Sequence, residues 1–117
     1  MGYIYVNMKE YDRGFELFET LINKETVDIG ALYQFARISA ISGEKPDKGI
    51  EYMKEYLKHE PIQGNPSHAA AYWRMGLIYE HKNDLEAAIK ALETSVELDP
   101  KYKAAKDDLK RIKEKKF

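Results

Sequence analysis

Few side chains of this sequence are placed for catalysis or for metal binding. His59, His68 and His81 are never four residues apart, and no carboxylate cluster completes a ligand set around them. The chain has no cysteine, which excludes disulfides, thiolate metal sites and cysteine nucleophiles together. It also lacks a Ser–His–Asp order, a glycine-rich phosphate loop and an HExxH motif. The sequence therefore predicts that this segment is not an enzyme, holds no metal and needs no cofactor.

Tyrosine, tryptophan and arginine side chains offer a different chemistry, which is the recognition of another protein. These residue types are enriched among the few that dominate binding energies. The chain has nine tyrosines and a single tryptophan, Trp73. Amphipathic helices would position them, since Leu85, Ala88, Leu92 and Val96 recur at the helical period of about 3.6 residues. The periodicity and the turn residues together predict seven helices, over residues 2–8, 11–24, 28–42, 46–59, 67–82, 84–98 and 101–115.

Residues 69–102 carry large and small side chains at regular intervals. The pattern consists of Tyr72, Met75, Gly76, Tyr79, Ala88, Leu92, Ser95 and Pro100. It resembles a tetratricopeptide repeat, a helix–turn–helix unit of about 34 residues. Tyr72 stands at the tryptophan position of that pattern, Met75 at the leucine position and Leu92 at the phenylalanine position. The resemblance implies a helical scaffold that binds partners and rarely carries out chemistry.

Two earlier copies of the pattern are less complete. Residues 29–61 form a second repeat, with one inserted residue in the Glu44-Lys45 turn, and residues 1–27 form a partial repeat. Because this partial repeat starts inside a first helix, we expect the native protein to extend before Met1. Residues 61–67 are predicted to be a loop and residues 101–115 a capping helix. The implied fold is one all-α domain over residues 1–117, a right-handed α-solenoid of about 2.5 repeats plus the capping helix.

Small residues in such repeats let the paired helices approach closely. The implied pairs are Gly76 with Ala88, Ala36 with Gly49, and Gly2 with Gly14, with Tyr79 filling the space beside them. A glycine inside a helix costs about 0.5–1 kcal/mol relative to alanine, so these glycines indicate sites with no room for a side chain. Helix ends are predicted at Gly43, Pro46, Ser67, Asn83 and Asp84.

The resemblance also implies which residues line the concave groove of the stack. They are Tyr3, Val6, Gly30, Tyr33, Arg37, Ala40, Ala70, Trp73, Leu77 and Glu80. The predicted partner-binding residues among them are Tyr3, Tyr33, Arg37, Trp73, Leu77 and Glu80. Packing within the repeat does not explain Trp73, because Tyr72 already fills the tryptophan position. Tyr33 and Trp73 stand where a carboxylate clamp for acidic chaperone tails would need lysine or asparagine, so we do not expect that class of partner.

Charge is concentrated at the C-terminal end. Residues 101–117 contain eight basic and three acidic residues, although the whole chain has a net charge of −1. Such a tail could contact nucleic acid, or its lysines could complement the dipole of the last helix and keep it solvated. We favour the second interpretation and expect no nucleic-acid partner. We also expect no membrane partner, because no apolar run approaches the roughly 18–20 residues of a membrane span.

Two functions are consistent with this sequence. The first is a protein–protein interaction module that binds a peptide or a partner surface in the concave groove. The second is a C-terminal accessory or dimerisation domain of a larger bacterial enzyme, since similar repeat tails follow hydrolase domains, including metallo-β-lactamase-like ones. The incomplete first repeat would then leave an apolar face around Tyr5, Phe15 and Phe18 for self-association. The sequence does not distinguish a cytoplasmic from a periplasmic location.

Overall fold

The computed structural model describes residues 8–23, 28–59 and 66–116. In these ranges the chain forms α1 (Met8–Ile22), α2 (Ile29–Ser42), α3 (Pro46–Leu57), α4 (His68–His81), α5 (Leu85–Leu98) and α6 (Lys103–Lys116). This part of the chain contains helices and no strand, which confirms the predicted all-α fold. Residues 2–7 of the first predicted helix lie outside the described residues, and so do Gly2, Tyr3, Tyr5 and Val6.

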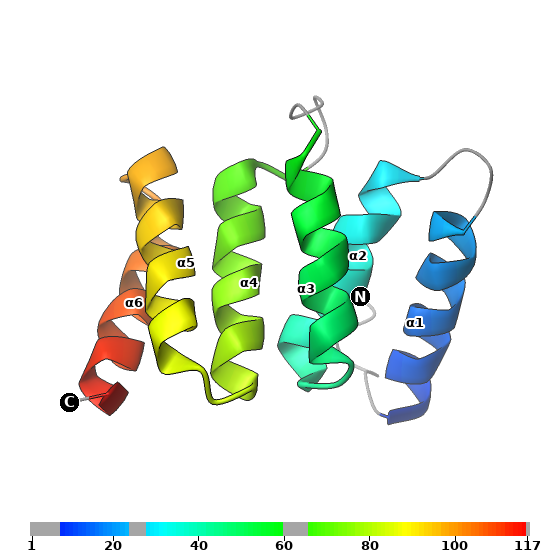
Figure 1. The fold of residues 1–117 in the computed structure, drawn as a ribbon, viewed down its shortest axis with the longest axis horizontal. Coiled ribbons are helices and arrows are strands. Elements are labelled where there is room, and N and C mark those ends of the chain that lie inside the picture. Colours follow the sequence, from blue (N-terminus) through cyan, green and yellow to red (C-terminus); the bar gives the residue numbers. More distant parts are fainter. Residues whose placement is uncertain (1–7, 24–27, 60–65, 117) are drawn as a thin grey trace.

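Consecutive helices run antiparallel and lie side by side, with α2 behind α3 and α6 behind α5 in the view of Figure 1. Contacts also join α2 to α4 and α4 to α6, so each helix pair stacks on the next one. The pairs α2/α3 and α4/α5 form the middle of this stack, and α1 and α6 lie at its two ends (Figure 1). Among the described residues, no helix is both long and apolar enough to cross a membrane.

Capping side chains mark the starts of three helices, and a left-handed residue follows the end of α4, where the sequence predicts these helix termini. Asp28, Ser67 and Asp84 each accept a hydrogen bond from the backbone N–H three residues later, at 3.3, 3.1 and 3.2 Å. Each bond satisfies one of the N–H groups that a helix start leaves without a partner. Asn83 before Asp84 has a φ of 63°, the left-handed conformation that ends α4.

The turn between α2 and α3 contains the inserted residue. Gly43 ends α2 in the left-handed conformation, with a φ of 78°, and Pro46 lies in the first turn of α3. Between them Lys45 also adopts a left-handed φ of 49°, which is uncommon for a residue other than glycine. The Ser39 hydroxyl donates a hydrogen bond to the Lys45 carbonyl at 3.3 Å. This contact fixes the lengthened turn against the buried side of α2.

Two helix starts differ from the prediction. α1 is helical from Met8, the first described residue, so residues 8–10, which were expected to lie before this helix, are part of it. α6 begins at Lys103 rather than at residue 101. Asp99 holds the preceding turn, since its carboxylate accepts the Lys101 N–H at 3.2 Å and its carbonyl accepts the Tyr102 N–H at 3.0 Å.

The main hydrophobic core lies between α1, α2, α3 and α4. The rings of Phe15 and Phe35 are 4.7 Å apart, and Tyr52 meets Phe35 edge-on at 4.8 Å. Phe15 is only 1% exposed, so the expectation that it lies on an open apolar face is wrong. Phe18 also packs partly buried against this core, because α2 covers the side of α1 that carries both rings. Leu17 is the large apolar side chain that α1 leaves exposed among the described residues.

Two of the glycines in the predicted pairs lie at close helix contacts. A Cβ atom on Gly76 would lie 2.7 Å from Leu92 Cγ and 3.3 Å from the Ala88 carbonyl, so α4 and α5 approach as predicted. Gly49 meets Ser39 rather than Ala36, at 2.7 Å, because the inserted residue shifts the register between α2 and α3. The remaining pattern positions are placed as follows: Ala36 and Ala88 are fully buried, Tyr79 is half-buried, Pro100 is exposed, and Gly14 faces Ile38.

Candidate protein-interaction face

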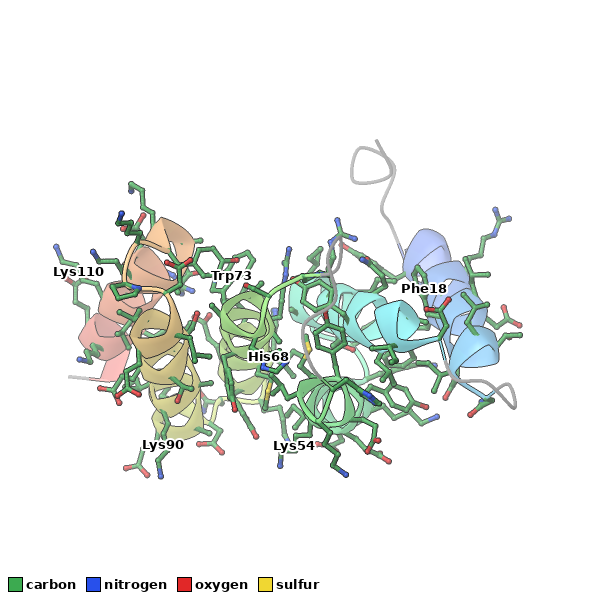
Figure 2. All side chains as sticks on the ribbon, turned by 90° about the horizontal axis from the view of Figure 1, so that it is seen from above. Phe18, Lys54, His68, Trp73, Lys90 and Lys110 are labelled. Atoms are coloured by element: carbon green, nitrogen blue, oxygen red, sulfur yellow. The ribbon has the colours of Figure 1, made fainter. Side chains whose placement is uncertain are left out.

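The helices α2, α4 and α6 bring most of the predicted binding residues to one side of the stack. We call this side the α2–α4–α6 face and define it by Tyr33, Arg37, Trp73, Arg74, Leu77, Glu80 and Arg111. Figure 2 shows Trp73 on the side opposite Lys54 of α3 and Lys90 of α5. Trp73, one of the predicted binding residues, therefore lies away from Lys54 and Lys90 on the outer helices α3 and α5.

Trp73 lies at the centre of this face, between α4 and α6. Its indole Nε1 donates a hydrogen bond to the Asp108 carboxylate at 2.7 Å. The Tyr102 ring meets the indole edge-on at 5.7 Å, and the Arg74 guanidinium lies over the indole ring at 4.2 Å from its centre. This distance is within the range of a cation–π contact. Trp73 is half-buried, so part of its side chain remains accessible to solvent.

Arg74 links Trp73 to the neighbouring helix α2. Its Nε donates a hydrogen bond to the Tyr33 hydroxyl at 3.3 Å. The two terminal nitrogens of the guanidinium make no hydrogen bond with any described residue, and the side chain is half-buried. Arg74 therefore offers planar N–H donors beside an aromatic ring, an arrangement suited to a carboxylate or a backbone carbonyl.

A network of charged side chains connects Glu80, near the C-terminal end of α4, to α6. Arg111 donates to both carboxylate oxygens of Glu80, at 2.5 and 2.8 Å, and Lys115 donates to the same carboxylate at 2.9 Å. These hydrogen bonds, those from Arg111 above all, lower the pKa of Glu80 to about 2. Arg111 also donates to Asp108 at 3.3 Å, and its pKa is raised, chiefly by the hydrogen bond with Glu80. The acid of the predicted groove is thus neutralised within the chain.

Three predicted groove residues are less accessible than expected. Tyr33 is only 5% exposed, because Tyr56 packs against its ring at 5.5 Å and Arg74 reaches its hydroxyl. Leu77 is half-buried against the main core, and Ala40 is buried. The prediction that the Tyr33 side chain lines an open groove is therefore wrong, because it is buried.

The other predicted groove residues remain near the surface of the described chain. Arg37 and Ala70 are half-buried, and the Arg37 guanidinium makes no ion pair with any described residue. Gly30 lines a small hollow of about 230 Å³ between α1 and α2, together with Phe18, Leu21 and Gln34. Tyr3 and Val6 lie outside the described residues.

Two histidine rings lie within hydrogen-bond distance of backbone carbonyls in other segments. His81, the last residue of α4, places its Nε2 2.8 Å from the carbonyl oxygen of Ala40, near the end of α2. His68 places its Nε2 2.8 Å from the His59 carbonyl, and the Tyr56 hydroxyl donates to the Pro66 carbonyl at 2.6 Å. These contacts anchor both ends of the long connection between α3 and α4. In the described ranges, no group of three or more histidine, aspartate or glutamate side chains could hold a metal ion.

Comparison with known proteins identifies the repeat. Residues 69–102 match the family model described as the tetratricopeptide repeat. This segment of the chain is therefore similar to the tetratricopeptide repeat family. A curated relative is the chloroplastic tetratricopeptide repeat domain-containing protein PYG7 of Arabidopsis thaliana. It is 25% identical over an alignment of 118 positions that covers 98% of this chain. The alignment covers 38% of that protein, so the chain spans about two fifths of its length.

The matched tetratricopeptide repeat contains α4, the turn after it and α5, which is the segment on which the sequence resemblance is strongest. Its register places Arg74 and Asp108 one repeat apart, at equivalent positions on α4 and α6. Each of these residues bonds to the aromatic residue on the preceding inner helix, Tyr33 and Trp73 respectively. Sequence analysis missed both residues, because they follow the concave position by one residue. They could have been predicted from the sequence by comparing Arg74 with Asp108, which occupies the same position one repeat later.

Proposed function

We propose that this chain binds a peptide or a surface segment of another protein along its α2–α4–α6 face. Tetratricopeptide repeats mediate protein–protein interactions, and this face contains the aromatic and guanidinium groups that dominate binding energies. The observation that carries the proposal is the Trp73–Arg74 pair. The guanidinium lies over the indole at 4.2 Å, and its two terminal nitrogens have no partner among the described residues.

The geometry of this pair favours a particular kind of ligand. A backbone carbonyl or a carboxylate of the ligand would accept from the terminal nitrogens of Arg74, and an apolar side chain beside it would cover the open side of Trp73. Arg37 on α2 adds a second guanidinium without an ion-pair partner in the described part of the chain. Glu80 contributes no free charge, since Arg111 and Lys115 already neutralise it. We therefore expect ligand segments that combine an acidic residue with an apolar one.

A peptide selection followed by affinity measurements tests this function. Peptides selected on the wild-type chain from a random displayed library would be synthesised and titrated by calorimetry. Arg74→Ala is expected to weaken their binding at least tenfold, about 1.4 kcal/mol. Arg74→Lys should recover only part of the loss, since an ammonium group keeps the charge without the planar fork.

Lys90→Ala provides the matched control, because Lys90 is exposed on α5, away from Trp73 (Figure 2). It should bind the selected peptides as the wild type does. Circular dichroism would establish that each variant keeps its helices. Equal affinity of the wild type and Arg74→Ala for every selected peptide would contradict the proposal.

The alternative function as an accessory domain of a larger enzyme gains no support from these observations. The name of the Arabidopsis thaliana relative refers to a tetratricopeptide repeat domain and not to an enzymatic activity. Of the residues expected to form a self-association face, Phe15 is buried, Phe18 is partly buried against the core, and Tyr5 lies outside the described residues. Interaction with a different protein is therefore the function that we propose.

A further inference from the structure

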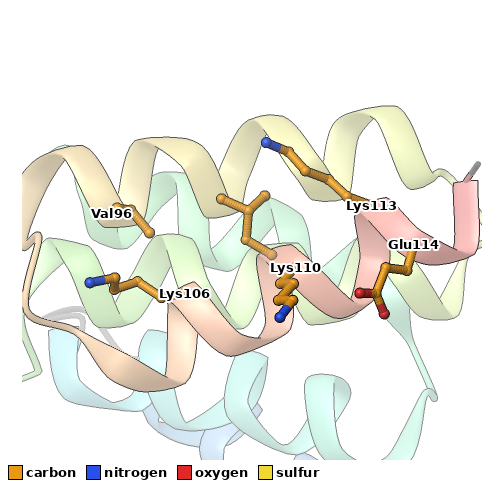
Figure 3. Close-up of a pocket in the computed structure, with 6 residues that line it drawn as sticks. Val96, Lys106, Lys110, Lys113 and Glu114 are labelled. Atoms are coloured by element: carbon orange, nitrogen blue, oxygen red, sulfur yellow. The ribbon is translucent and has the colours of Figure 1, made fainter.

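A groove between α5 and α6 lies apart from the α2–α4–α6 face. It has a volume of about 560 Å³ and is lined by Val96, Lys106, Leu109, Lys110, Lys113 and Glu114 (Figure 3). Val96 and Leu109 are half-buried and belong to the smaller core cluster of the chain. The aliphatic stems of the lysines extend this apolar surface, while their ammonium groups can reach water. The groove thus has an apolar floor and a basic rim.

The groove residues on α6 can be compared with the residues one repeat earlier on α4. Lys106, Leu109, Lys110 and Lys113 lie one repeat after Tyr72, Met75, Gly76 and Tyr79. On α4, this set of positions receives the second helix of the repeat, because Gly76 lies against Leu92 and Ala88 of α5. α6 therefore exposes the face that, on α4, is covered by the second helix of the repeat, α5.

Charge distinguishes the groove on α6 from its counterpart on α4. Lys110 replaces Gly76, so a helix cannot approach α6 as closely as α5 approaches α4. Lys106 and Lys110 make no ion pair with any described residue, and Lys113 has only a loose contact with Glu93 at 3.7 Å. Glu114 is the single acid among the lining residues. An occupant would need apolar side chains for the floor and acidic ones for the rim.

We propose that this groove binds an amphipathic helix of a partner protein, with an apolar stripe flanked by glutamate or aspartate residues. The apolar stripe would cover Val96 and Leu109, and the flanking acids would pair with Lys106, Lys110 and Lys113. The proposal does not depend on the function of the α2–α4–α6 face. It assigns the basic end of the chain a second protein-binding surface in addition to its role as a solvated cap.

Two designed helical peptides of about 18 residues, roughly five turns, provide the probes. Both carry the same leucine stripe, and glutamates flank the stripe in one peptide where lysines flank it in the other. Binding to the full chain would be measured by fluorescence anisotropy. We expect the glutamate peptide to bind at least tenfold more tightly than the lysine peptide, with an affinity that falls as salt is added.

Charge reversal locates the binding site. The double variant Lys106→Glu/Lys110→Glu should lose at least tenfold in affinity for the glutamate peptide. Both lysines are exposed, so the fold should be kept, which circular dichroism would verify. Lys54→Glu is the matched control, because Lys54 is exposed on α3, away from α6 (Figure 2). The control should bind the glutamate peptide as the wild type does. A loss in the double variant that is larger than the loss in Arg74→Ala would separate this site from the α2–α4–α6 face, which also favours acidic and apolar segments.

Three results would overturn the proposal. The glutamate peptide could fail to bind, or it could bind the double variant as tightly as the wild type. Alternatively, sedimentation could show that the chain forms a dimer that the double variant does not form. In that last case the occupant of the groove would be a second copy of this chain, and not an acidic helix of a partner.

Discussion

Two junctions connect the inner helices of this chain, and they are built from different chemistry. At the α2–α4 junction, Tyr33, Ala36 and Ile78 belong to the buried hydrophobic core. Two polar contacts cross it, from Arg74 to the Tyr33 hydroxyl and from His81 to the Ala40 carbonyl. At the α4–α6 junction, Trp73 bonds to Asp108, and Glu80 pairs with Arg111 and Lys115. The opposite sides of one helix, α4, thus serve an apolar junction and a charged one.

The difference has consequences for stability. Burial of apolar area responds weakly to salt and pH, whereas ion pairs weaken when salt screens them or when a partner is protonated. We therefore expect the end of the stack at α6 to detach under conditions that leave α2, α3 and α4 packed. Both proposed binding surfaces include α6 or its contact with α4, so the charged junction would also control whether these surfaces exist.

The largest effect is expected from a change at the apolar junction. Ile78 is fully buried, and Gly49 of α3 packs close to its Cδ1 atom. Ile78→Ala should lower the free energy of unfolding by about 2–5 kcal/mol, from lost burial and the cavity that remains. Ile78→Val, the control, should cost about 0.5–1.5 kcal/mol. Urea denaturation would measure both, and a loss that rises strongly with salt would contradict the apolar description.

The second effect concerns the charged junction. Glu80→Gln removes the charge that Arg111 and Lys115 share, and should cost about 1–2 kcal/mol once solvent screening around the exposed end of Arg111 is considered. Hydrogen exchange should show faster exchange in α6 and unchanged protection in α2. Glu93→Gln is the control, because the contact of Glu93 with Lys113 is long and exposed, and it should have little effect.

Acidification should reproduce the effect of Glu80→Gln in the wild type. The folded-state pKa of Glu80 is about 2, below its usual value of 4.5. Stability from this group is therefore complete above about pH 4.5 and is lost as the pH falls toward 2. Protection of α6 amides should decline over this range in the wild type, and the decline should be smaller in Glu80→Gln. An identical pH dependence in the two proteins would show that Glu80 does not hold α6.

The sequence was sufficient to predict most of the described helix ends, because these ends have a local cause. Gly43, Pro46, Ser67 and Asp84 mark the helix ends, and the spacing from Tyr72 to Pro100 predicted the matched repeat. It was not sufficient to predict the pairing across helices. The insertion near Lys45 changed the partner of Gly49 from Ala36 to Ser39, a shift that depends on the turn conformation.

The candidate site was predicted in part, for a similar reason. Trp73 is on the face that the repeat pattern indicates, but its neighbours Tyr102 and Asp108 come from the end of the chain, about a repeat away. The exposure of Tyr33 depended on whether Tyr56 and Arg74 cover it, and no spacing within α2 contains that information. Residue types and repeat positions thus predict which face is used, and contacts between repeats determine what remains exposed there.

The smallest effect is expected from the single polar bond of the indole. Trp73→Phe keeps an aromatic ring against Tyr102 but removes the Nε1 donor to Asp108. Asp108 still accepts from Arg111, so the loss should be only about 0.5–1.5 kcal/mol, the usual net value of one hydrogen bond. Trp73→Ala should cost more, because it also removes the ring that packs against the α6 cluster. Thermal unfolding of both variants would test this order. Equal losses would mean that the hydrogen bond, and not the ring, attaches α6 to α4 at this position.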